Sequence, residues 1–194
     1  MNASALVSKA MKAGAEMYFA KDGALYSMNP PETMFGFTYH AQMIPPMKPE
    51  HTLILGYGGG TVAALMRKIW GDCKITGVDQ EKYDSKFIEY KMKIMDAKKF
   101  LWDATTPAFK DYVFAKEKYD YICVDLWNGK QVPEFIFYAE FAVRLMEISK
   151  GMVALNIHAD DFKKLRAFKD YGFEFERHVQ IENQLVVWWS RIND

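Results

Sequence analysis

The sequence predicts an α/β protein built on a doubly wound, mostly parallel sheet of seven strands. After residue 50, short apolar runs alternate with longer amphipathic stretches, which is the pattern of strands joined by crossover helices. The runs near 52, 120 and 152 are almost wholly apolar, as strands must be when helices cover both faces of a sheet. The chain ends in two period-2 segments separated by Glu182-Asn183, which predict a C-terminal antiparallel hairpin.

The individual elements follow from the same patterns. Strands are expected at 52–56, 74–78, 92–95, 120–125, 152–157, 173–181 and 184–192. Helices are expected near 60–70, 81–90, 97–102, 134–148 and 160–171. Residues 51–194 should form one domain. Residues 1–50 hold one short helical stretch, a turn at 21–23 and several prolines, so they predict a short N-terminal extension with little core of its own.

Composition and charge limit the classes of partner. The 194 residues are 50% hydrophobic and carry 25 basic and 25 acidic side chains, with no long run of one charge. Such a balance offers no electrostatic surface for a nucleic acid or an anionic membrane. No apolar stretch approaches the ~20 residues that span a bilayer, and Lys9, Lys12 and Glu16 interrupt any signal-peptide core. We therefore expect a cytoplasmic protein with a small-molecule substrate.

The two cysteines carry no chemical signal. Cys73 and Cys123 lie far apart, with neither metal-ligand nor disulfide spacing. Both are expected to be buried as small apolar side chains, and no metal site is expected.

The strongest local signal is the glycine-rich segment 56–60, Gly-Tyr-Gly-Gly-Gly, between a predicted strand and a predicted helix. Glycine permits a tight turn and lets the main chain approach a ligand, while the amides of a helix N-terminus favour a partly anionic group. A dinucleotide fingerprint needs glycine at the sixth place, which is Thr61 here. Gly56, Gly58 and Gly60 instead follow the pattern of S-adenosylmethionine sites, with a purely structural turn as the alternative.

Three acids follow predicted strands. Asp79 ends the second strand, where its carboxylate can accept both ribose hydroxyls or cap a helix that starts at Gln80. Asp96, followed by Ala97, ends the third and is suited either to the adenine amino group or to capping the next helix. Asp125 closes an apolar run with no local cap to make, so we expect it at the crevice where open α/β sheets bind ligands.

Aromatic and histidine side chains are weaker candidates. Trp127 is equally able to stack on an acceptor and to pack on the core, whereas Phe135 and Phe137 favour the core. His40 and His158 are candidate proton acceptors, with ordinary polar contacts as the alternative.

Taken together, these segments resemble the spermidine synthase-like superfamily of class I S-adenosylmethionine-binding, Rossmann-like transferases. The resemblance covers about residues 20 to 157 and runs through Asp22-Gly23, Tyr39-His40, Leu53 to Thr61, Val78-Asp79, Asp96-Ala97, Tyr119 to Asp125 and Ala154-Leu155-Asn156. It implies the seven-stranded fold, bound S-adenosylmethionine or its decarboxylated form, and transfer of a group from the sulfonium. It also suggests a homodimer that acts on a small amine.

The chain departs from the aminopropyltransferases of this family at several positions. They carry an acid at the position of Gly59, which holds the amine of the decarboxylated cofactor. They carry a second acid at the position of Asn128, and an amide cannot serve there as a general base. Their N-terminal β-domain is also longer than the segment before Tyr39-His40. The stretch from Asp125 to Pro133 looks more like the members thought to be methyltransferases or still unassigned.

The leading hypothesis is therefore methyl transfer to a small amine or similar nucleophile. Aminopropyl transfer is the second hypothesis, and a non-catalytic nucleoside-binding or dimerisation module is the third. The expected cofactor-binding residues are Gly56, Gly58, Gly60, Asp79, Asp96, Ala97 and Asp125. The catalytic candidates are Asp125, Tyr39 and His40, and the substrate-binding candidates are Trp127 and Asn128.

Overall fold

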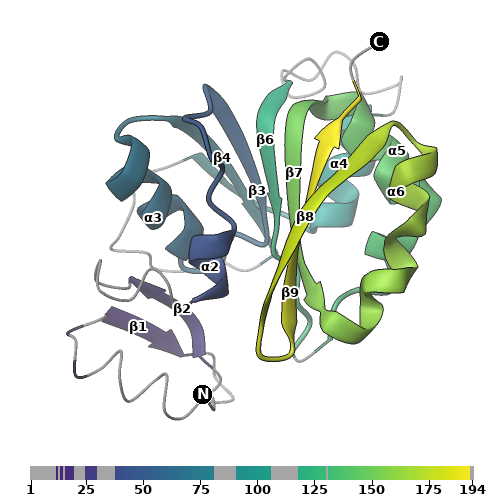
Figure 1. The fold of residues 1–194 in the computed structure, drawn as a ribbon. Helices are drawn as coiled ribbons and strands as arrows, with labels where there is room; N and C mark the ends of the chain where they lie inside the picture. Colours follow the sequence, from purple (N-terminus) through teal and green to yellow (C-terminus); the bar gives the residue numbers. More distant parts are fainter. Residues whose placement is uncertain are drawn as a thin grey trace.

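The computed structural model describes residues 12, 14, 16–19, 25–29, 38–80, 91–105, 118–129 and 131–192. The main sheet has seven strands in the order β5-β4-β3-β6-β7-β9-β8, with helices on both faces (Figure 1). A separate two-stranded antiparallel sheet consists of β1 (Glu16–Phe19) and β2 (Leu25–Asn29). The predicted α/β class is confirmed. The turn predicted at 21–23 lies outside the described residues.

The central strands are parallel and share one carboxyl edge. They are β3 (His51–Leu55), β4 (Lys74–Asp79), β5 (Lys91–Ile94), β6 (Tyr119–Val124) and β7 (Ser149–His158). The chain then returns through β8 (Phe173–Ile181) and β9 (Gln184–Arg191), and β9 pairs antiparallel with both β7 and β8. Glu182, in the connection between them, has a φ of 56°.

The predicted helix at 134–148 is divided in two. The 3-10 helix η3 (Glu134–Phe137) is followed by extended Tyr138, with φ −82° and ψ 143°, and then by α5 (Ala139–Ile148). Ile136 and Phe141 are both fully buried. On one continuous helix, positions five apart would point about 140° away from each other. The extended residue therefore allows both side chains to enter the same core.

The remaining helices differ in how closely they match their predictions. Those at 60–70 and 97–102 correspond to α3 (Thr61–Trp70) and α4 (Ala97–Thr105). The one at 160–171 consists of the 3-10 helix η4 (Ala159–Arg166) and the short α6 (Ala167–Asp170). The helix predicted at 81–90 lies outside the described residues. No helix in the described ranges is long and apolar enough to cross a lipid bilayer.

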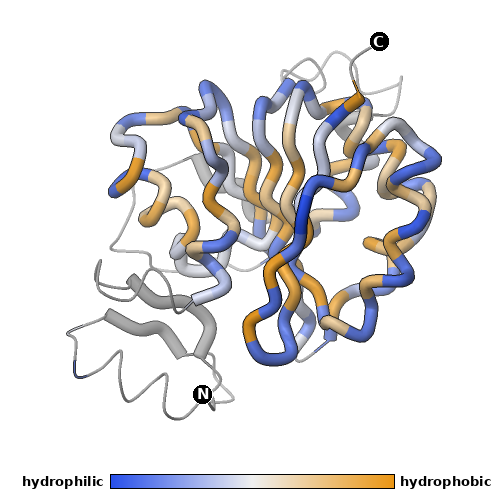
Figure 2. Tube along the Cα trace, viewed as in Figure 1, coloured by the Kyte–Doolittle hydropathy of each residue, from blue (hydrophilic) through white to orange (hydrophobic). Residues whose placement is uncertain are grey.

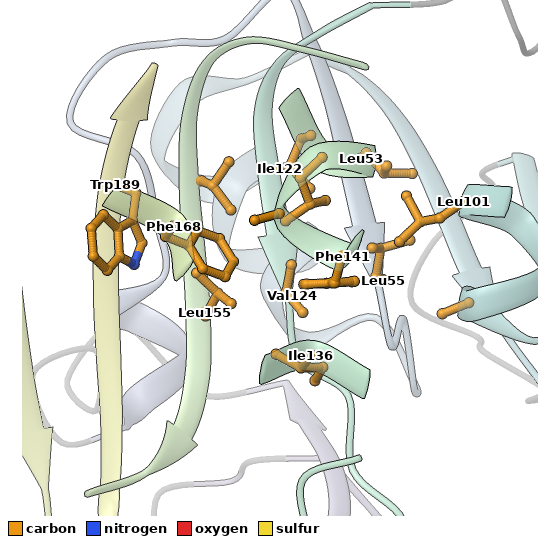
Figure 3. Close-up of a cluster of buried hydrophobic side chains, with 14 of the residues drawn as sticks. Leu53, Leu55, Leu101, Ile122, Val124, Ile136, Phe141, Leu155, Phe168 and Trp189 are labelled. Carbon is orange, nitrogen blue, oxygen red and sulfur yellow. The ribbon is translucent and has the colours of Figure 1, made fainter. Parts of the chain in front are cut away.

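Successive residues of the central strands pack into two cores on opposite faces of the sheet. Leu53, Leu55 and Ile122 lie in the core that contains Leu101 of α4 and Phe141 of α5 (Figure 3). Ile54 and Tyr121 lie in the other core, with residues of α3. Successive side chains of a strand point to opposite faces, so a strand covered on both sides must be apolar throughout. Figure 2 shows the resulting hydrophobic colouring along the middle strands.

The segment just before residue 50 packs on the sheet. The short helix α2 (Tyr39–Gln42) contacts α3 and β9, and Met43, which follows it, is fully buried. Trp188 Nε1 donates to the Gln42 carbonyl oxygen at 3.0 Å, and the Tyr121 hydroxyl donates to the carbonyl of Met43. The sequence-predicted boundary between residues 1–50 and 51–194 stays a prediction, but α2 is held by the sheet.

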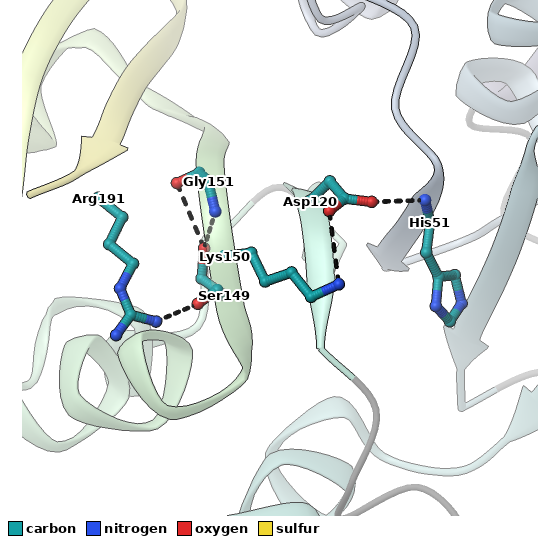
Figure 4. Close-up of polar contacts among 6 residues, drawn as sticks. All are labelled: His51, Asp120, Ser149, Lys150, Gly151 and Arg191. Atoms are coloured by element: carbon teal, nitrogen blue, oxygen red, sulfur yellow. Dashed lines mark hydrogen bonds and ion pairs between the residues drawn. The ribbon is translucent and has the colours of Figure 1, made fainter. Parts of the chain in front are cut away.

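A polar network joins the amino ends of the central strands (Figure 4). The His51 amide donates to Asp120 Oδ2 at 2.8 Å, and Lys150 Nζ lies 3.8 Å from Asp120 Oδ1. Arg191 donates to the carbonyl of Ser149. These contacts connect β3, β6, β7 and β9 at the edge opposite the predicted site.

Candidate functional site

The glycine turn leads from β3 into α3 at the carboxyl edge of the sheet. Gly56, Gly58 and Gly60 have φ values of 81°, 52° and 87°, which favour glycine. The amides of Gly56 and Tyr57 both donate to the Val78 carbonyl, at 2.9 and 3.1 Å. The turn is therefore fastened to the end of β4 before α3 begins.

At two of the three glycines, contacts within the protein itself leave little room for a side chain. A Cβ on Gly56 would lie 2.1 Å from the Asp125 carbonyl oxygen, and a Cβ on Gly60 would lie 3.0 Å from the Tyr57 hydroxyl. The structural alternative raised by the sequence thus applies to these two positions, because the fold demands glycine there with or without a ligand.

Tyr57 supports the turn from behind. Its ring is buried in the α3 core, and a Cβ on Gly77 of β4 would lie 2.3 Å from its Cδ2 atom. Its hydroxyl has no hydrogen-bond partner among the described residues, and burial raises its pKa above the ordinary value. Sequence reasoning treated Tyr57 as a variable position of the motif. A glycine inside β4 was the only available signal of this packing.

Asp79 contacts the glycine turn directly. The buried carboxylate accepts a hydrogen bond from the Gly58 amide, with 2.7 Å between nitrogen and Oδ2. A carboxylate has two oxygens and about four acceptor positions, so it can hold the turn and still accept from hydroxyl groups. The expected proximity of Asp79 to the turn is therefore present in the structure. Its ribose-binding role stays a prediction.

Asp125 follows β6, and three side-chain donors converge on its carboxylate. Tyr39 Oη donates to Oδ2 at 3.2 Å, while Trp127 Nε1 and Asn156 Nδ2 donate to Oδ1 at 3.1 and 2.9 Å. Burial raises the pKa of Asp125 to about 6, the three donors oppose that rise, and the charge of Asp79 adds to it. The group is mostly ionised at neutral pH and titrates close to it, which is a property of many functional carboxylates.

Tyr39 and His40 play different parts in this cluster. Their rings stack with centroids 3.8 Å apart, but Tyr39 is the one that reaches Asp125. His40 is buried, its Nδ1 has no hydrogen-bond partner among the described residues, and burial lowers its pKa to about 3. A neutral imidazole with so acidic a conjugate form is a poor proton acceptor at neutral pH, so Tyr39 is better placed for a role in the site.

The two proposed substrate-binding residues are placed differently. Trp127 contacts Asp125 and meets the His158 ring edge-on, with centroids 4.9 Å apart. Asn128 is exposed in a turn whose main chain pairs with Gln131. The structure thus joins Trp127 to the Asp125 cluster, and the role of Asn128 stays a prediction.

Asn156 is the residue that sequence reasoning missed as a site residue. It appeared only within the series that carried the family resemblance. In the structure it is fully buried on β7 and donates to Asp125, while its own Oδ1 has no partner among the described residues. A polar side chain inside an otherwise apolar strand was the signal that could have identified it.

Asp96 is exposed and caps α4. Its Oδ1 accepts from the Lys99 amide at 2.9 Å, so the capping alternative is observed, and contact with adenine stays a prediction. Ala97, beside it, is buried in the core.

The cysteines differ from each other in burial. Cys123 is buried as predicted, but Cys73 is only half-buried because it lies in the turn before β4 rather than within the strand. Within the described ranges, no three His, Cys, Asp or Glu side chains are grouped to hold a metal.

Comparison with known proteins identifies the fold. No protein-family profile matches the chain. A polyamine aminopropyltransferase from Vibrio vulnificus (strain CMCP6) is 27% identical over 114 residues, which are 56% of this chain and 38% of that protein. The solved structure of spermidine synthase in complex with the transition state analogue AdoDATO matches 90% of this chain and 66% of its own, with a TM-score of 0.61 and 14% identity. The chain has the spermidine synthase-like class I fold.

This spermidine synthase-like class I fold is shared by enzymes with different acceptors. Ribosomal protein L11 methylase from Lactobacillus delbrueckii subsp. bulgaricus matches 83% of this chain and 78% of its own, with a TM-score of 0.59 and 14% identity. Because the fold is common to a methylase and an aminopropyltransferase, it leaves the transferred group and the acceptor open. The α/β, class I type of fold implied by the sequence resemblance is confirmed.

Proposed function

We propose that this chain is an S-adenosylmethionine-dependent transferase that moves a methyl group to a small amine or a similar nucleophile. The observation that carries the proposal is the contact between the glycine turn and two acids at one edge of the sheet. Asp79 accepts from the Gly58 amide, and the Asp125 main chain lies against Gly56. The donors and acceptors present suit a nucleoside that bears a positive charge, because hydroxyls can donate to one carboxylate while the cation lies near the other.

The proposed roles follow the position of each residue. The main chain of 56–60 lines the cofactor, Asp79 binds the ribose, and Asp96 with Ala97 borders the adenine. Asp125 faces the sulfonium or the acceptor. The fold shared with a methylase and with spermidine synthase supports this assignment.

The chemistry asks little of the protein beyond alignment and a proton acceptor. When bound, S-adenosylmethionine supplies an electrophilic methyl carbon on a sulfonium that departs as a neutral thioether. The chain therefore needs no acid for the leaving group. Asp125 accepts a hydrogen bond from the acceptor amine and takes the proton that is released when the new nitrogen–carbon bond forms. Alignment of this kind can supply ~7–11 kcal/mol of a barrier.

Aminopropyl transfer is the second candidate, supported by the aminopropyltransferase relative and the spermidine synthase structure. Against it stand Gly59 and Asn128, where the family's aminopropyltransferases have acids. The two candidates differ in the form of the cofactor that they prefer.

Thermal unfolding with added ligands tests the proposal. The ligands are S-adenosylmethionine, its decarboxylated form, methylthioadenosine and NAD. A ligand at ~100 times its Kd adds ~2.7 kcal/mol, which raises the Tm of a chain of this size by about 5–10 °C. Preference for S-adenosylmethionine supports methyl transfer, and preference for the decarboxylated form supports aminopropyl transfer. Stabilisation by NAD alone, or by none of the four, contradicts the proposal.

Two matched variants test at which edge of the sheet the ligand binds. Asp79→Asn keeps an acceptor for the Gly58 amide but removes the charge, so we expect it to lose most of the ligand-induced rise in Tm. Asp120→Asn makes the same change at the opposite edge, where Asp120 contacts His51 and Lys150, and should keep the full rise (Figure 4). Equal losses in both variants would contradict binding at the carboxyl edge. A panel of amines, with consumption of S-adenosylmethionine as the readout, then identifies the acceptor.

A further inference from the structure

Asn156 connects the candidate catalytic carboxylate to the rigid part of the sheet. On β7, Leu155 pairs with Val124 of β6, which places Asn156 beside Asp125. Its Nδ2 donates to Asp125 Oδ1 at 2.9 Å, and the side chain is fully buried.

The three donors to Asp125 come from supports of unequal rigidity. Tyr39 belongs to the four-residue helix α2, and Trp127 lies in the loop after β6. Asn156 instead lies in a strand that is paired on both sides, with β6 and with β9. A donor held by a paired strand defines the orientation of its acceptor more closely than donors on a one-turn helix or a loop do.

The buried amide is costly for the fold alone. Its Oδ1 has no hydrogen-bond partner among the described residues, and an unpaired buried acceptor is destabilising. An apolar side chain of similar size would avoid that loss. The contact with Asp125 is the feature of this position that requires an amide.

We propose that Asn156 is a positioning residue that holds the Asp125 carboxylate against β7 in its ionised form. The catalytic meaning of this role rests on the proposed function, whereas the contact itself does not. Among the described residues, the titratable groups near Asp125 include Asp79 at the end of β4, Tyr121 and Cys123 of β6, and three groups that meet it directly or through one ring: Tyr39, His40, which stacks on Tyr39, and His158, whose ring meets Trp127. Burial raises the pKa of Tyr121 and Cys123, so both are neutral near pH 6.

The test is a titration of the Asp125 carboxyl carbon by NMR in the full, ligand-free chain. The wild-type midpoint should lie near the pKa of about 6. Asn156→Leu removes the donor and keeps the volume, so we expect the midpoint to rise by about one pH unit, a tenfold change in the ionisation constant. Asn156→Asp places two carboxyl groups in contact, and their titration should separate into two steps, one of them well above the wild-type midpoint.

Controls separate positioning from general damage to the strand. Ile157→Val alters the neighbouring buried side chain without touching Asp125, and its midpoint should match the wild type. A wild-type midpoint in Asn156→Leu, or a single unshifted step in Asn156→Asp, overturns the proposal. If Asn156→Leu does not fold, the titration is made with Asn156→Asp and Asn156→Ser instead, and an unshifted wild-type midpoint in both overturns the proposal.

The titration also separates this inference from the proposed function. Shifted midpoints in a chain that binds none of the nucleosides would support the positioning role and reject the transferase. Nucleoside binding with unshifted midpoints would support the proposed function and reject the positioning role of Asn156. If binding is found, Asn156→Leu should move the pH dependence of turnover in the same direction as the carboxyl midpoint.

Discussion

At the scale of single residues, the ionised Asp125 carboxylate lowers the free energy of unfolding at neutral pH, and it also gives the site a group that titrates near neutral pH. Burial raises its pKa from 3.8 to about 6, so the folded chain holds this proton more tightly than the unfolded chain does. The contribution of that proton to the free energy of unfolding is therefore fully present below about pH 4 and is lost as the pH rises through 6. A shift of this size corresponds to at most about 3 kcal/mol.

Replacing the carboxyl group tests this reasoning. Asp125→Asn cannot ionise, so we expect it to be more stable than the wild type by about 1–2 kcal/mol at pH 8, with little difference near pH 4. Urea unfolding at both pH values measures the difference. A variant that is less stable at pH 8 than at pH 4, relative to the wild type, would show that the three donors outweigh burial.

Both the backbone conformation and the packing at position 56 require glycine. Gly56→Ala places a Cβ 2.1 Å from the Asp125 carbonyl oxygen at a residue with φ +81°, and we expect a loss of about 2–4 kcal/mol in the free energy of unfolding. Gly129→Ala is the matched control, because its φ is +60° and a Cβ there meets nothing within 4 Å. It should lose only about 1 kcal/mol. Similar losses in both variants would mean that the close approach to Asp125 is relieved at little cost.

At the scale of elements, the attachment of α2 to the sheet brings Tyr39 to Asp125. The carbonyl oxygens of Gln42 and Met43 accept from Trp188 and Tyr121, which belong to β9 and β6. A helix of four residues is too short to be stable alone, so its position depends on these contacts. A segment expected to extend from the domain thereby contributes to the candidate site.

Two adjacent tryptophans allow this attachment to be measured. Both are buried, but Trp188 Nε1 donates to Gln42, whereas Trp189 Nε1 has no partner among the described residues. We expect Trp188→Phe to be more destabilising than Trp189→Phe by about 1 kcal/mol, because only the first leaves a carbonyl without its donor. Chemical denaturation of the two variants gives the comparison. A larger loss in Trp189→Phe would indicate that packing outweighs the hydrogen bond.

At the scale of the whole molecule, the sheet separates a structural edge from a functional one. The network of His51, Asp120 and Lys150 joins the amino ends of the strands, while the glycine turn, Asp79 and Asp125 occupy the carboxyl ends. All parallel strands point the same way, so groups that follow different strands gather at one edge.

The same topology predicts how stability is distributed. β3, β6 and β7 are paired on both sides and lie between the two cores, whereas β5 and β8 form the edges of the sheet. We expect amide hydrogen exchange to be slowest in β3, β6 and β7, the three middle strands of the sheet, and faster in the edge strands, which can open locally without global unfolding. Mass spectrometry of peptic fragments measures this order. Equal protection of β8 and β6 would contradict it and indicate a single cooperative unit.

The sequence by itself determined the class of fold, the strands of the seven-stranded sheet and the acids that follow them, but not β1 and β2. These features depend on the alternation of apolar and polar residues over short distances, and on glycines and carboxylates placed directly after apolar runs. The strands at 52–56, 74–78 and 120–125 could be located in this way, and Asp79 and Asp125 could be assigned to one edge, because parallel strands leave no other arrangement.

Only the tertiary structure decided which side chains meet. Tyr39 and Asn156 reach Asp125 across 86 and 31 positions of the chain, and the local pattern around either residue does not show that Asp125 is its partner. The same holds for the contact of Tyr57 with Gly77 and for the break at Tyr138, which lets Ile136 and Phe141 share a core. The physical reason is that periodicity reflects which face of an element is buried, whereas a hydrogen bond depends on the order of the strands and on the register between them.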